Sequence, residues 1–375
     1  MREYISKTKR VVIKIGTNLL IEKNNIDDSY VKSLAKQISK LKKNKNIDVV
    51  IVSSGSIGLG LKALNLKAKA KTLPEKQAAA AIGQSRLMHT YNKAFEKRGL
   101  LTAQVLITQE DFRDRVRYIN AKNTINTLLA ENVIPIINEN DTVAVDEIKF
   151  GDNDILSAHI TNIIGAEVLI VLSSVDGLID YSKNAVIREV LEIDDDIMNV
   201  VSDTKTDLGT GGMRSKLEAG RIVNKSGEYM IIANGKEKNI ILRLIKGEEV
   251  GTIFIPLEKK LTSRKRWIAF NQKVKGEIFI DEGAKKAILD KGKSLLPIGI
   301  LKIKEYFSQG DLVSIVCNEK EIAKGLVNYD TEEVNKIKGF KTSEIEKQLG
   351  EIYYKEVIHR DNMVVMCEEK KYIKK

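Results

Sequence analysis

The chain has 375 residues, of which 43% are apolar and 30% are charged, and its formal net charge at pH 7 is +11. It lacks a run of about 20 apolar residues and the apolar stretch of a signal peptide, so we expect neither a membrane span nor a secretory leader. Two cysteines, Cys317 and Cys367, and three scattered histidines argue against a zinc-type site and favour a reducing compartment, the cytoplasm. The basic excess is typical of a lysine-rich solvated surface, although it would also suit anionic substrates or nucleic acid.

Short apolar runs rich in β-branched residues recur through the first half of the chain and predict buried strands. In chain order these runs cover residues 9–15, 48–52, 102–107, 133–137 and 168–172. Segments with helical spacing of apolar residues lie between them, at residues 28–43, 73–97, 118–130 and 154–164. Because the strands alternate with helices and show no polar alternation, the sequence predicts an α/β fold, a three-layer αβα sandwich around a mostly parallel sheet.

A different pattern begins near Pro256. Shorter segments separated by glycines and charged residues follow from residue 276 to about residue 350, which is typical of a compact, mostly β module. We therefore expect a large domain at residues 1–258, a polar basic linker at 259–275, the small β module at 276–355 and a C-terminal tail at 356–375.

Polar, glycine-rich segments follow four of the five predicted strands, and parallel sheets bind their ligands beyond the carboxyl ends of the strands. After the first strand, Lys14 attracts notice because it lies in an apolar run, where burial of an ammonium group is costly. Gly16 and Thr17 follow it directly. We therefore favour a role in the ligand crevice over a lysine that reaches solvent at the sheet edge.

The segment after the second strand, VSSGSIGLG at residues 52–60, again combines glycines with hydroxyl groups. Ser53, Ser54 and Gly55 would serve as donors to a carboxylate or a phosphate. Serine–glycine turns are also common without any function, so this segment alone is a weak signal.

The segment after the fourth strand, INENDTVAVDEIKFGDND, is rich in acidic and amide side chains. They are Asn138, Asn140, Asp141, Asp146, Asp152, Asn153 and Asp154. Such oxygens would bind an α-ammonium group or orient lysines near bound phosphates. A solvated acidic loop has the same composition, but this segment joins a buried strand to an apolar helix.

A further glycine-rich segment, LGTGGMRSKLEAGRIV at residues 208–223, leads into a helical pattern. Gly209, Gly211 and Gly212 would let backbone N–H groups approach an anion, and Lys216 would add a mobile positive charge. The spacing is not that of a Walker A loop. Taken alone, the segment fits a phosphate-binding loop and a flexible surface loop equally well.

Two lysines, a glycine loop and an acidic–amide cluster together indicate phosphoryl transfer by positioning and charge neutralisation. No Ser–His–Asp pattern and no nucleophilic cysteine context competes with this interpretation. Magnesium would be carried by the nucleotide phosphates, with water completing its shell.

In their order along the chain these motifs resemble the amino acid kinase family, and within it the enzymes that phosphorylate glutamate. The resemblance rests on VVIKIGTNLL, IVSSGSIGLG, KQAAAAIGQSRLM, RYINAKNTINTLL, PIINENDTVAVDEIKFGDNDILSA, LGTGGMRSKLEAG and LTSRKRWI. The C-terminal part of the chain resembles a PUA domain, on the segments GEIFIDEGAKKAI, SLLPIGI, YFSQGDLVSI and IAKGLVNYD. The resemblance runs from about Lys9 to about Met363.

The resemblance implies the amino acid kinase fold and transfer of a phosphoryl group from ATP, with Mg²⁺, to the side-chain carboxylate of L-glutamate, the first step of proline biosynthesis. It implies that Lys14 and Lys216 stabilise the transferring group and that Asp154 orients them. The implied glutamate site consists of Ser54, Asp141 and Asn153, with Gly55, Thr17 and Asn138 nearby. The implied ATP contacts are Ser173, Ser174, Thr210, Gly211, Gly212, Met213, Arg214, Ser215 and Lys216. Feedback inhibition by proline and a homodimer or homotetramer are further expectations from the resemblance.

One departure concerns the nucleotide contacts. The family usually has Thr-Asp before Val-Asp-Gly-Leu-Tyr, whereas this chain has Ser173 and Ser174 before VDGLI. The acid is therefore missing at Ser174 and the aromatic residue at Ile179, while Asp176 remains.

Two other interpretations stay open. One is a related kinase that acts on acetylglutamate, aspartate or a nucleoside monophosphate, although aspartokinases usually carry ACT domains where this chain has its β module. The other is RNA binding by the PUA module, which its mixed charges and the lack of an aromatic-rich strip disfavour. We expect a regulatory or structural role for the module.

Overall fold

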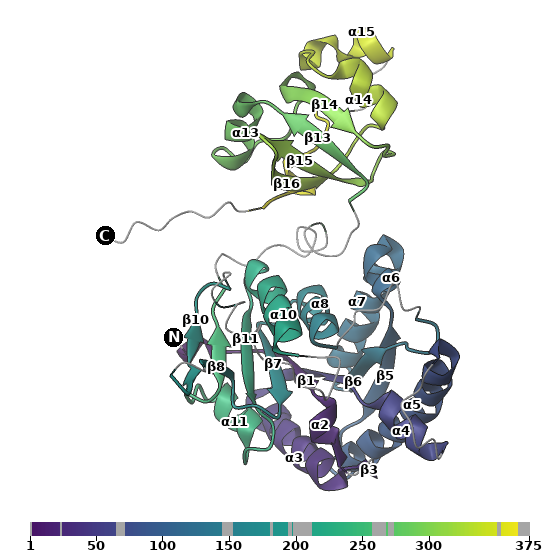
Figure 1. The fold of residues 1–375 in the computed structure, drawn as a ribbon, viewed down its shortest axis with the longest axis vertical. Helices are drawn as coiled ribbons and strands as arrows, with labels where there is room; N and C mark the ends of the chain where they lie inside the picture. The colour runs from purple at the N-terminus through teal and green to yellow at the C-terminus, as the bar shows by residue number, and fades with distance from the viewer. Residues whose placement is uncertain are drawn as a thin grey trace. The chain divides into compact units, whose positions relative to one another are not determined.

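The computed structural model divides the chain into two compact units, Met1–Lys260 and Leu261–Lys375, and each is described by itself (Figure 1). The structure describes residues 2–22, 25–64, 72–144, 153–180, 183–193, 197, 212–256, 268, 274–350 and 354–366. Within these ranges no helix is both long enough and apolar enough to cross a bilayer.

An eight-stranded sheet forms the centre of the first unit, in the order β10-β12-β11-β7-β1-β4-β6-β5. Its strands are β1 (Arg10–Ile15), β4 (Asp48–Ser53), β5 (Thr102–Ile107), β6 (Ile134–Glu139), β7 (Val168–Ser173), β10 (Glu189–Val190), β11 (Tyr229–Asn234) and β12 (Thr252–Phe254). All neighbours pair in parallel except β11 and β12. The mostly parallel sheet expected from the sequence is therefore confirmed.

Helices cover both faces of this sheet (Figure 1). One face carries α3 (Asp28–Lys45), α5 (Leu73–Glu96) and α11 (Ile240–Ile245), and the other carries α7 (Arg115–Ala130), α8 (Asn153–Ile164) and α10 (Met213–Lys225). This is the three-layer arrangement that the alternating strands and helices predicted.

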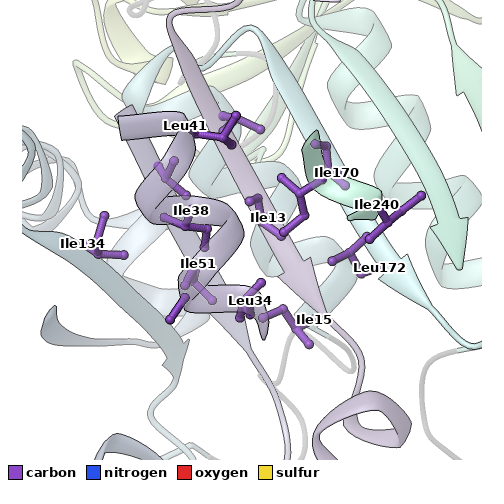
Figure 2. Close-up of a cluster of buried hydrophobic side chains, with 14 of the residues drawn as sticks. Ile13, Ile15, Leu34, Ile38, Leu41, Ile51, Ile134, Ile170, Leu172 and Ile240 are labelled. Carbon is purple, nitrogen blue, oxygen red and sulfur yellow. The ribbon is translucent and has the colours of Figure 1, made fainter. Parts of the chain in front are cut away.

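The core on the α3 side explains why these segments fold as they do. Figure 2 shows Leu34, Ile38 and Leu41 of α3 facing the sheet, where Ile13 and Ile51 lie. These side chains are buried, and each contributes about 1.5–3 kcal/mol by leaving water. Successive residues of a strand point to opposite faces, so Lys14, next to Ile13, points toward the layer that contains α8.

Several short elements complete the first unit. They are α1 (Glu3–Ser6), α2 (Thr17–Leu20), α4 (Ser56–Ala63), α6 (Gln109–Arg113) and two hairpins, β2 (Ile21–Glu22) with β3 (Asn25–Ile26) and β8 (Leu178–Asp180) with β9 (Ala185–Ile187).

The helix α4 occupies most of the glycine-rich segment after β4, for which the sequence analysis named no helix. Its glycines serve close packing against α5, because a Cβ atom at Gly60 would lie 1.7 Å from the carbonyl oxygen of Ala79. Conversely, a Cβ atom at Gly83 of α5 would lie 1.7 Å from the carbonyl oxygen of Ser56. The two backbones thus touch directly, an approach that only glycine permits.

The second unit is built on a five-stranded sheet in the order β14-β13-β15-β16-β17. Its strands are β13 (Gly276–Ile280), β14 (Ile300–Lys304), β15 (Leu312–Cys317), β16 (Lys320–Leu326) and β17 (Met363–Val365). The helical elements are α13 (Glu282–Leu289), η2 (Pro297–Gly299), α14 (Thr331–Ile337), η3 (Thr342–Glu344), α15 (Ile345–Leu349) and η4 (Arg360–Asn362). A compact core includes Phe307 and Tyr329. Part of the expected C-terminal tail belongs to this unit, since β17 pairs with β16.

Candidate active site

The candidate site lies at the carboxyl ends of β7, β1, β4 and β6, which are consecutive strands of the sheet in that order. Parallel pairing aligns these ends, with Lys14 of β1 opposite Val52 of β4 and Val171 of β7. Open α/β sheets bind ligands at this edge. Two groups of polar side chains gather there, one ionic and one neutral.

Lys14, Asp154 and Lys216 form the ionic cluster. Asp154 is the second residue of α8 and is 0% exposed, while Lys14 and Lys216 are 4% and 6% exposed. The Nζ atom of Lys14 lies 2.5 Å from Asp154 Oδ1, and the Nζ atom of Lys216 lies 3.0 Å from Asp154 Oδ2. One buried carboxylate therefore holds two ammonium groups through its two oxygens, as a site for a highly charged anion requires.

The protonation state of Asp154 follows from these contacts. Burial by itself opposes ionisation of the carboxyl group, but the two nearby ammonium groups of Lys14 and Lys216 outweigh it and lower the pKa to about 2. Asp154 is thus a carboxylate at neutral pH. Its charge keeps the two lysines paired in a place where an isolated ammonium group would be costly.

The first turn of α10 holds Asp154 from a second residue as well. The hydroxyl oxygen of Ser215 lies 3.1 Å from Asp154 Oδ2 and 3.0 Å from the carbonyl oxygen of Gly212, and its single proton can be donated to either acceptor. Gly212 precedes the helix, with open space where a Cβ atom would stand. The start of α10, which the sequence predicted as an anion-binding helix terminus, is therefore joined to the ionic cluster.

Other residues of the predicted nucleotide contacts lie apart from this cluster or outside the described residues. Arg214 Nε lies 3.4 Å from Glu218 in an exposed pair on α10, next to Met213 at the start of the helix. Thr210 and Gly211, together with Gly209, lie outside the described residues.

The neutral group, which we call the amide network, is centred on Asn153. Its Nδ2 atom lies 2.9 Å from the carbonyl oxygen of Ser53, 2.8 Å from Ser54 Oγ and 2.9 Å from Asn138 Oδ1. Asn153 precedes Asp154 in α8, so the amide network and the ionic cluster are adjacent. The structure thus brings together Ser54, Asn138 and Asn153, which the sequence placed at three different segments.

Asn138 extends the amide network toward Asp141. Asn138 Nδ2 donates to Ser56 Oγ at 3.3 Å and to Gln84 Oε1 at 2.9 Å. Ser56 in turn donates its hydroxyl to Asp141 Oδ2 at 3.4 Å. The predicted substrate residue Asp141 is therefore connected to Asn138 through a serine of α4.

Gly55 and Thr17 lie beside this network. Gly55 has a left-handed backbone with φ of 104° and forms the N-terminal boundary of α4 without a side-chain cap. A Cβ atom there would lie 3.1 Å from Ile21 and 3.8 Å from Thr17 Cγ2. The first N–H groups of α4 have no side-chain cap, and such an uncapped helix start favours a bound carboxylate.

Ser173 and Ser174 lie at the carboxyl end of β7. The carbonyl oxygen of Ser173 accepts a hydrogen bond from the backbone N–H of Gly235 at 2.8 Å. The side chain of Asp176 accepts a hydrogen bond from the side-chain amide of Asn234 at 2.9 Å. These contacts join the ends of β7 and β11. Among the described residues, no hydrogen bond links either serine to the ionic cluster.

The sequence interpretation missed Gln84 and the roles of Ser53 and Ser56. Ser53 is buried and shares a hydrogen bond of 2.9 Å with the hydroxyl of Tyr91, and Ser56 and Gln84 both contact Asn138. A local signal did exist for Gln84, because this polar residue lies on the apolar face of a long helix between buried Ala80 and Leu87 positions.

Comparison with known proteins gives two matches to families. The amino acid kinase family matches residues 9–234, and the PUA domain family matches residues 276–349.

Individual relatives cover nearly the whole chain. A glutamate 5-kinase from Thermoanaerobacter sp. (strain X514) is 50% identical over 370 residues, covering 97% of this chain and 99% of that protein. A glutamate 5-kinase from Caldanaerobacter subterraneus subsp. tengcongensis is 49% identical over 370 residues, with the same shares of both chains. A solved carbamate kinase from Giardia lamblia bound to AMP-PNP is 17% identical with a TM-score of 0.48, covering 67% of this chain and 99% of its own.

Proposed function

This chain belongs to the amino acid kinase family, and we propose that it transfers the γ-phosphoryl group of ATP to the side-chain carboxylate of L-glutamate. A carboxylate oxygen of glutamate would form a new bond to phosphorus, and the bond from phosphorus to the β,γ-bridging oxygen would break. The products would be ADP and L-glutamyl 5-phosphate, the first intermediate on the route to proline. The observation that carries this proposal is the pair of buried lysines on Asp154, adjacent to the amide network.

In this reaction the ionic cluster would neutralise the charge of the transferring group. Lys14 and Lys216 contact different oxygens of the Asp154 carboxylate, and both are buried, so their ammonium groups already lie in a water-poor site before substrate arrives. Charges fixed in this way stabilise a transition state without reorganisation. Asp154 would orient the lysines and would not itself exchange a proton, given its lowered pKa.

The amide network would hold glutamate. We assign the α-ammonium group to the Asp141 carboxylate and the Asn153 amide oxygen, because both are acceptors in one connected network. The α-carboxylate would lie against Ser54 Oγ and the N–H groups that begin α4 at Gly55, with Thr17 and Asn138 close by. The side-chain carboxylate would then extend toward the lysines.

ATP would bind with its phosphates at residues 210–216, which include the start of α10, and with further contacts at Ser173 and Ser174. Asp154, the carboxylate beside the lysines, is engaged by two ammonium groups and by Ser215. Magnesium would accordingly be held mainly by the phosphate oxygens of the nucleotide and by water, and would supply further neutralisation of the phosphate charge.

A hydroxamate assay tests the reaction directly. The full chain is incubated with ATP, Mg²⁺, hydroxylamine and one acceptor, which is glutamate, aspartate or acetylglutamate. Uridylate is tested as a fourth acceptor, and its phosphorylation is measured by the release of ADP. We expect hydroxamate from glutamate well above the other acceptors, since an acyl phosphate reacts with hydroxylamine. Turnover of another acceptor with none of glutamate would contradict the proposal.

The second unit has a different role in this proposal. We assign catalysis to residues 1–258 and a regulatory or structural role to the PUA module at residues 276–355, joined by residues 259–275. RNA binding would show as salt-sensitive submicromolar affinity of the full chain that disappears on truncation after about Pro256. We expect no such binding.

We further propose that proline inhibits the enzyme by competing for the glutamate site, and that the chain acts as a homodimer or homotetramer in the cytoplasm. Proline carries the α-carboxylate and an α-amino nitrogen that the amide network would hold in glutamate. Inhibition should therefore be relieved by excess glutamate, and light scattering should give a mass of two or four times 42.0 kDa. Inhibition that is insensitive to glutamate, or a monomeric mass, would contradict these two expectations.

A further inference from the structure

The long helix α5 supplies none of the residues assigned above to substrate, yet it contacts several of the segments that carry them. Its backbone packs directly on α4, as Gly83 shows. Its side chains reach the ends of β4 and β6 and the turn that follows β6. These contacts are Tyr91 to Ser53 at 2.9 Å, Gln84 to Asn138 at 2.9 Å and Gln77 to the carbonyl oxygen of Ala144 at 3.3 Å.

Among these contacts, the one from Gln84 holds one end of an oriented amide. An asparagine side chain has a donor end and an acceptor end, and Asn138 uses both. Its Oδ1 accepts from the backbone N–H of Glu139 and from the Asn153 side chain, both at 2.9 Å, while its Nδ2 donates to Gln84 Oε1. The backbone N–H of Glu139 therefore fixes which end of Asn138 faces Asn153, and Gln84 holds the opposite end of the same amide in place.

The orientation passes from Asn138 to Asn153. Because Asn138 presents its oxygen, Asn153 must present its nitrogen, and that nitrogen also contacts Ser54 Oγ and the carbonyl oxygen of Ser53. The Asn153 oxygen is thereby directed to the other side of the amide. Gln84 itself is oriented by donating its Nε2 to Gln104 Oε1 at 3.3 Å.

We propose that Gln84 is a positioning residue for the glutamate site, which holds the Asn138 amide so that its oxygen supports Asn153 in the orientation that the carbonyl oxygen of Ser53 fixes. This inference rests on the proposed function. Gln84 is 7% exposed and, among the described residues, its hydrogen bond to the assigned substrate residues is the one to Asn138. Loss of its acceptor would leave the Asn138 nitrogen with one weaker partner, Ser56 at 3.3 Å, so the Asn138 side chain would be held less firmly against Asn153.

Substitution of Gln84 by methionine tests the inference. Gln84→Met keeps the length of the side chain and removes the acceptor. We expect the KM for glutamate to rise by about 10-fold, because a buried hydrogen bond that orients the site is lost. The kcat and the KM for ATP should stay within about 2-fold, since the lost interaction concerns glutamate binding and not the transition state.

A conservative variant separates an orienting acceptor from a packing residue. Gln84→Glu retains an oxygen for Asn138 Nδ2, and the partly exposed β5 lets Gln104 turn its amide to donate. We expect Gln84→Glu to restore most of the affinity for glutamate at neutral pH. A KM as high as that of Gln84→Met would overturn the proposal.

Gln37→Met provides the matched control. Gln37 is also a buried glutamine on the same face of the sheet, and its Oε1 accepts one hydrogen bond, from the backbone N–H of Ile241 at 3.0 Å. The Gln37→Met variant should have a lower melting temperature and an unchanged KM for glutamate. Equal KM values for Gln37→Met and Gln84→Met would contradict the positioning role.

Two further outcomes are distinguishable. If the wild-type chain fails to turn over glutamate, the proposed function is wrong. If Gln84→Met does not fold, Gln104→Leu tests the same chain of contacts from the sheet edge, because it removes the acceptor that orients Gln84. We expect a rise of about 3-fold in the KM for glutamate, and an unchanged KM would overturn the inference.

Discussion

The ionic cluster of Lys14, Asp154 and Lys216 and the amide network around Asn138 and Asn153 are adjacent in space but are held by different forces. In the ionic cluster, two positive charges share one buried carboxylate, and the attraction depends on the exclusion of water. In the amide network, neutral groups are held by short directional hydrogen bonds.

Because of this difference, we expect the ionic cluster to act in catalysis and the amide network to act in substrate binding. Buried charges stabilise developing charge, so changes in the ionic cluster should affect kcat and the stability of the fold. Oriented neutral groups recognise a ligand, so changes in the amide network should affect the KM for glutamate. Each variant below tests whether that division holds.

The largest expected effect follows from removing the charge that the lysines share. Asp154→Asn keeps the shape of the side chain but leaves two buried ammonium groups without a counter-charge. We expect the free energy of unfolding to fall by about 3–5 kcal/mol, as measured by urea denaturation. A loss below about 1 kcal/mol would show that water reaches the cluster and screens it.

Removing one lysine should act on catalysis. Lys216→Ala deletes one of the two ammonium groups, and we expect kcat to fall by roughly 10²–10³-fold, as on removal of one transition-state donor. Steady-state kinetics with glutamate and ATP give the value. Lys225→Ala, at the exposed far end of the same helix, is the control and should retain wild-type kcat. Unchanged kcat in a folded Lys216→Ala variant would refute the assigned role.

The complementary change is made at Asp141, the carboxylate that is joined to the neutral amide network through Ser56. Asp141→Ala removes the carboxylate that accepts from Ser56, and we expect the KM for glutamate to rise by about 10- to 100-fold through loss of a charged hydrogen bond. The kcat at saturating glutamate should change far less. An unaltered KM for glutamate would contradict the division between the two regions.

Acidic pH should weaken the ionic cluster and leave the neutral network intact. The folded-state pKa of Asp154 is lowered from 3.8 to about 2, so its contribution to stability is complete above pH 4 and is lost as pH falls toward 2. This lowering of the Asp154 pKa corresponds to about 2 kcal/mol in the free energy of unfolding, which is lost at the acid end. Urea denaturation of the wild type and Asp154→Asn between pH 2 and pH 5 should show their stabilities converging at the acid end. A constant difference across that range would contradict the lowered pKa.

Much of the fold was predictable because its signals are local. The apolar runs of β1, β4, β6 and β7 mark strands buried on both faces, and the missing polar alternation indicates a parallel sheet. The short strands β10 and β12 at the sheet edge were not identified, since two or three residues are too few to carry a period. The helix α4 was also missed, because its glycines reflect contact with α5.

Part of the candidate site was also predictable from local signals. Lys14 stood out because an ammonium group in an apolar strand needs a partner, and Asn138 and Asn153 stood out because they flank a buried strand and a helix. Gln84 carried only a weak signal, a polar residue on an apolar helix face, and its partner Asn138 is distant in the sequence.

The sequence by itself determined which segments become buried strands, where polar residues interrupt them and, through family resemblance, which residues belong to the reaction. These properties follow from hydrophobic periodicity and from the cost of burying charge, both of which are readable within a few residues. Only the tertiary structure decided that Asp154 divides its two oxygens between Lys14 and Lys216, and that α5 holds Asn138 through Gln84. Those contacts depend on strand order and helix packing, which bring together side chains that no local pattern connects.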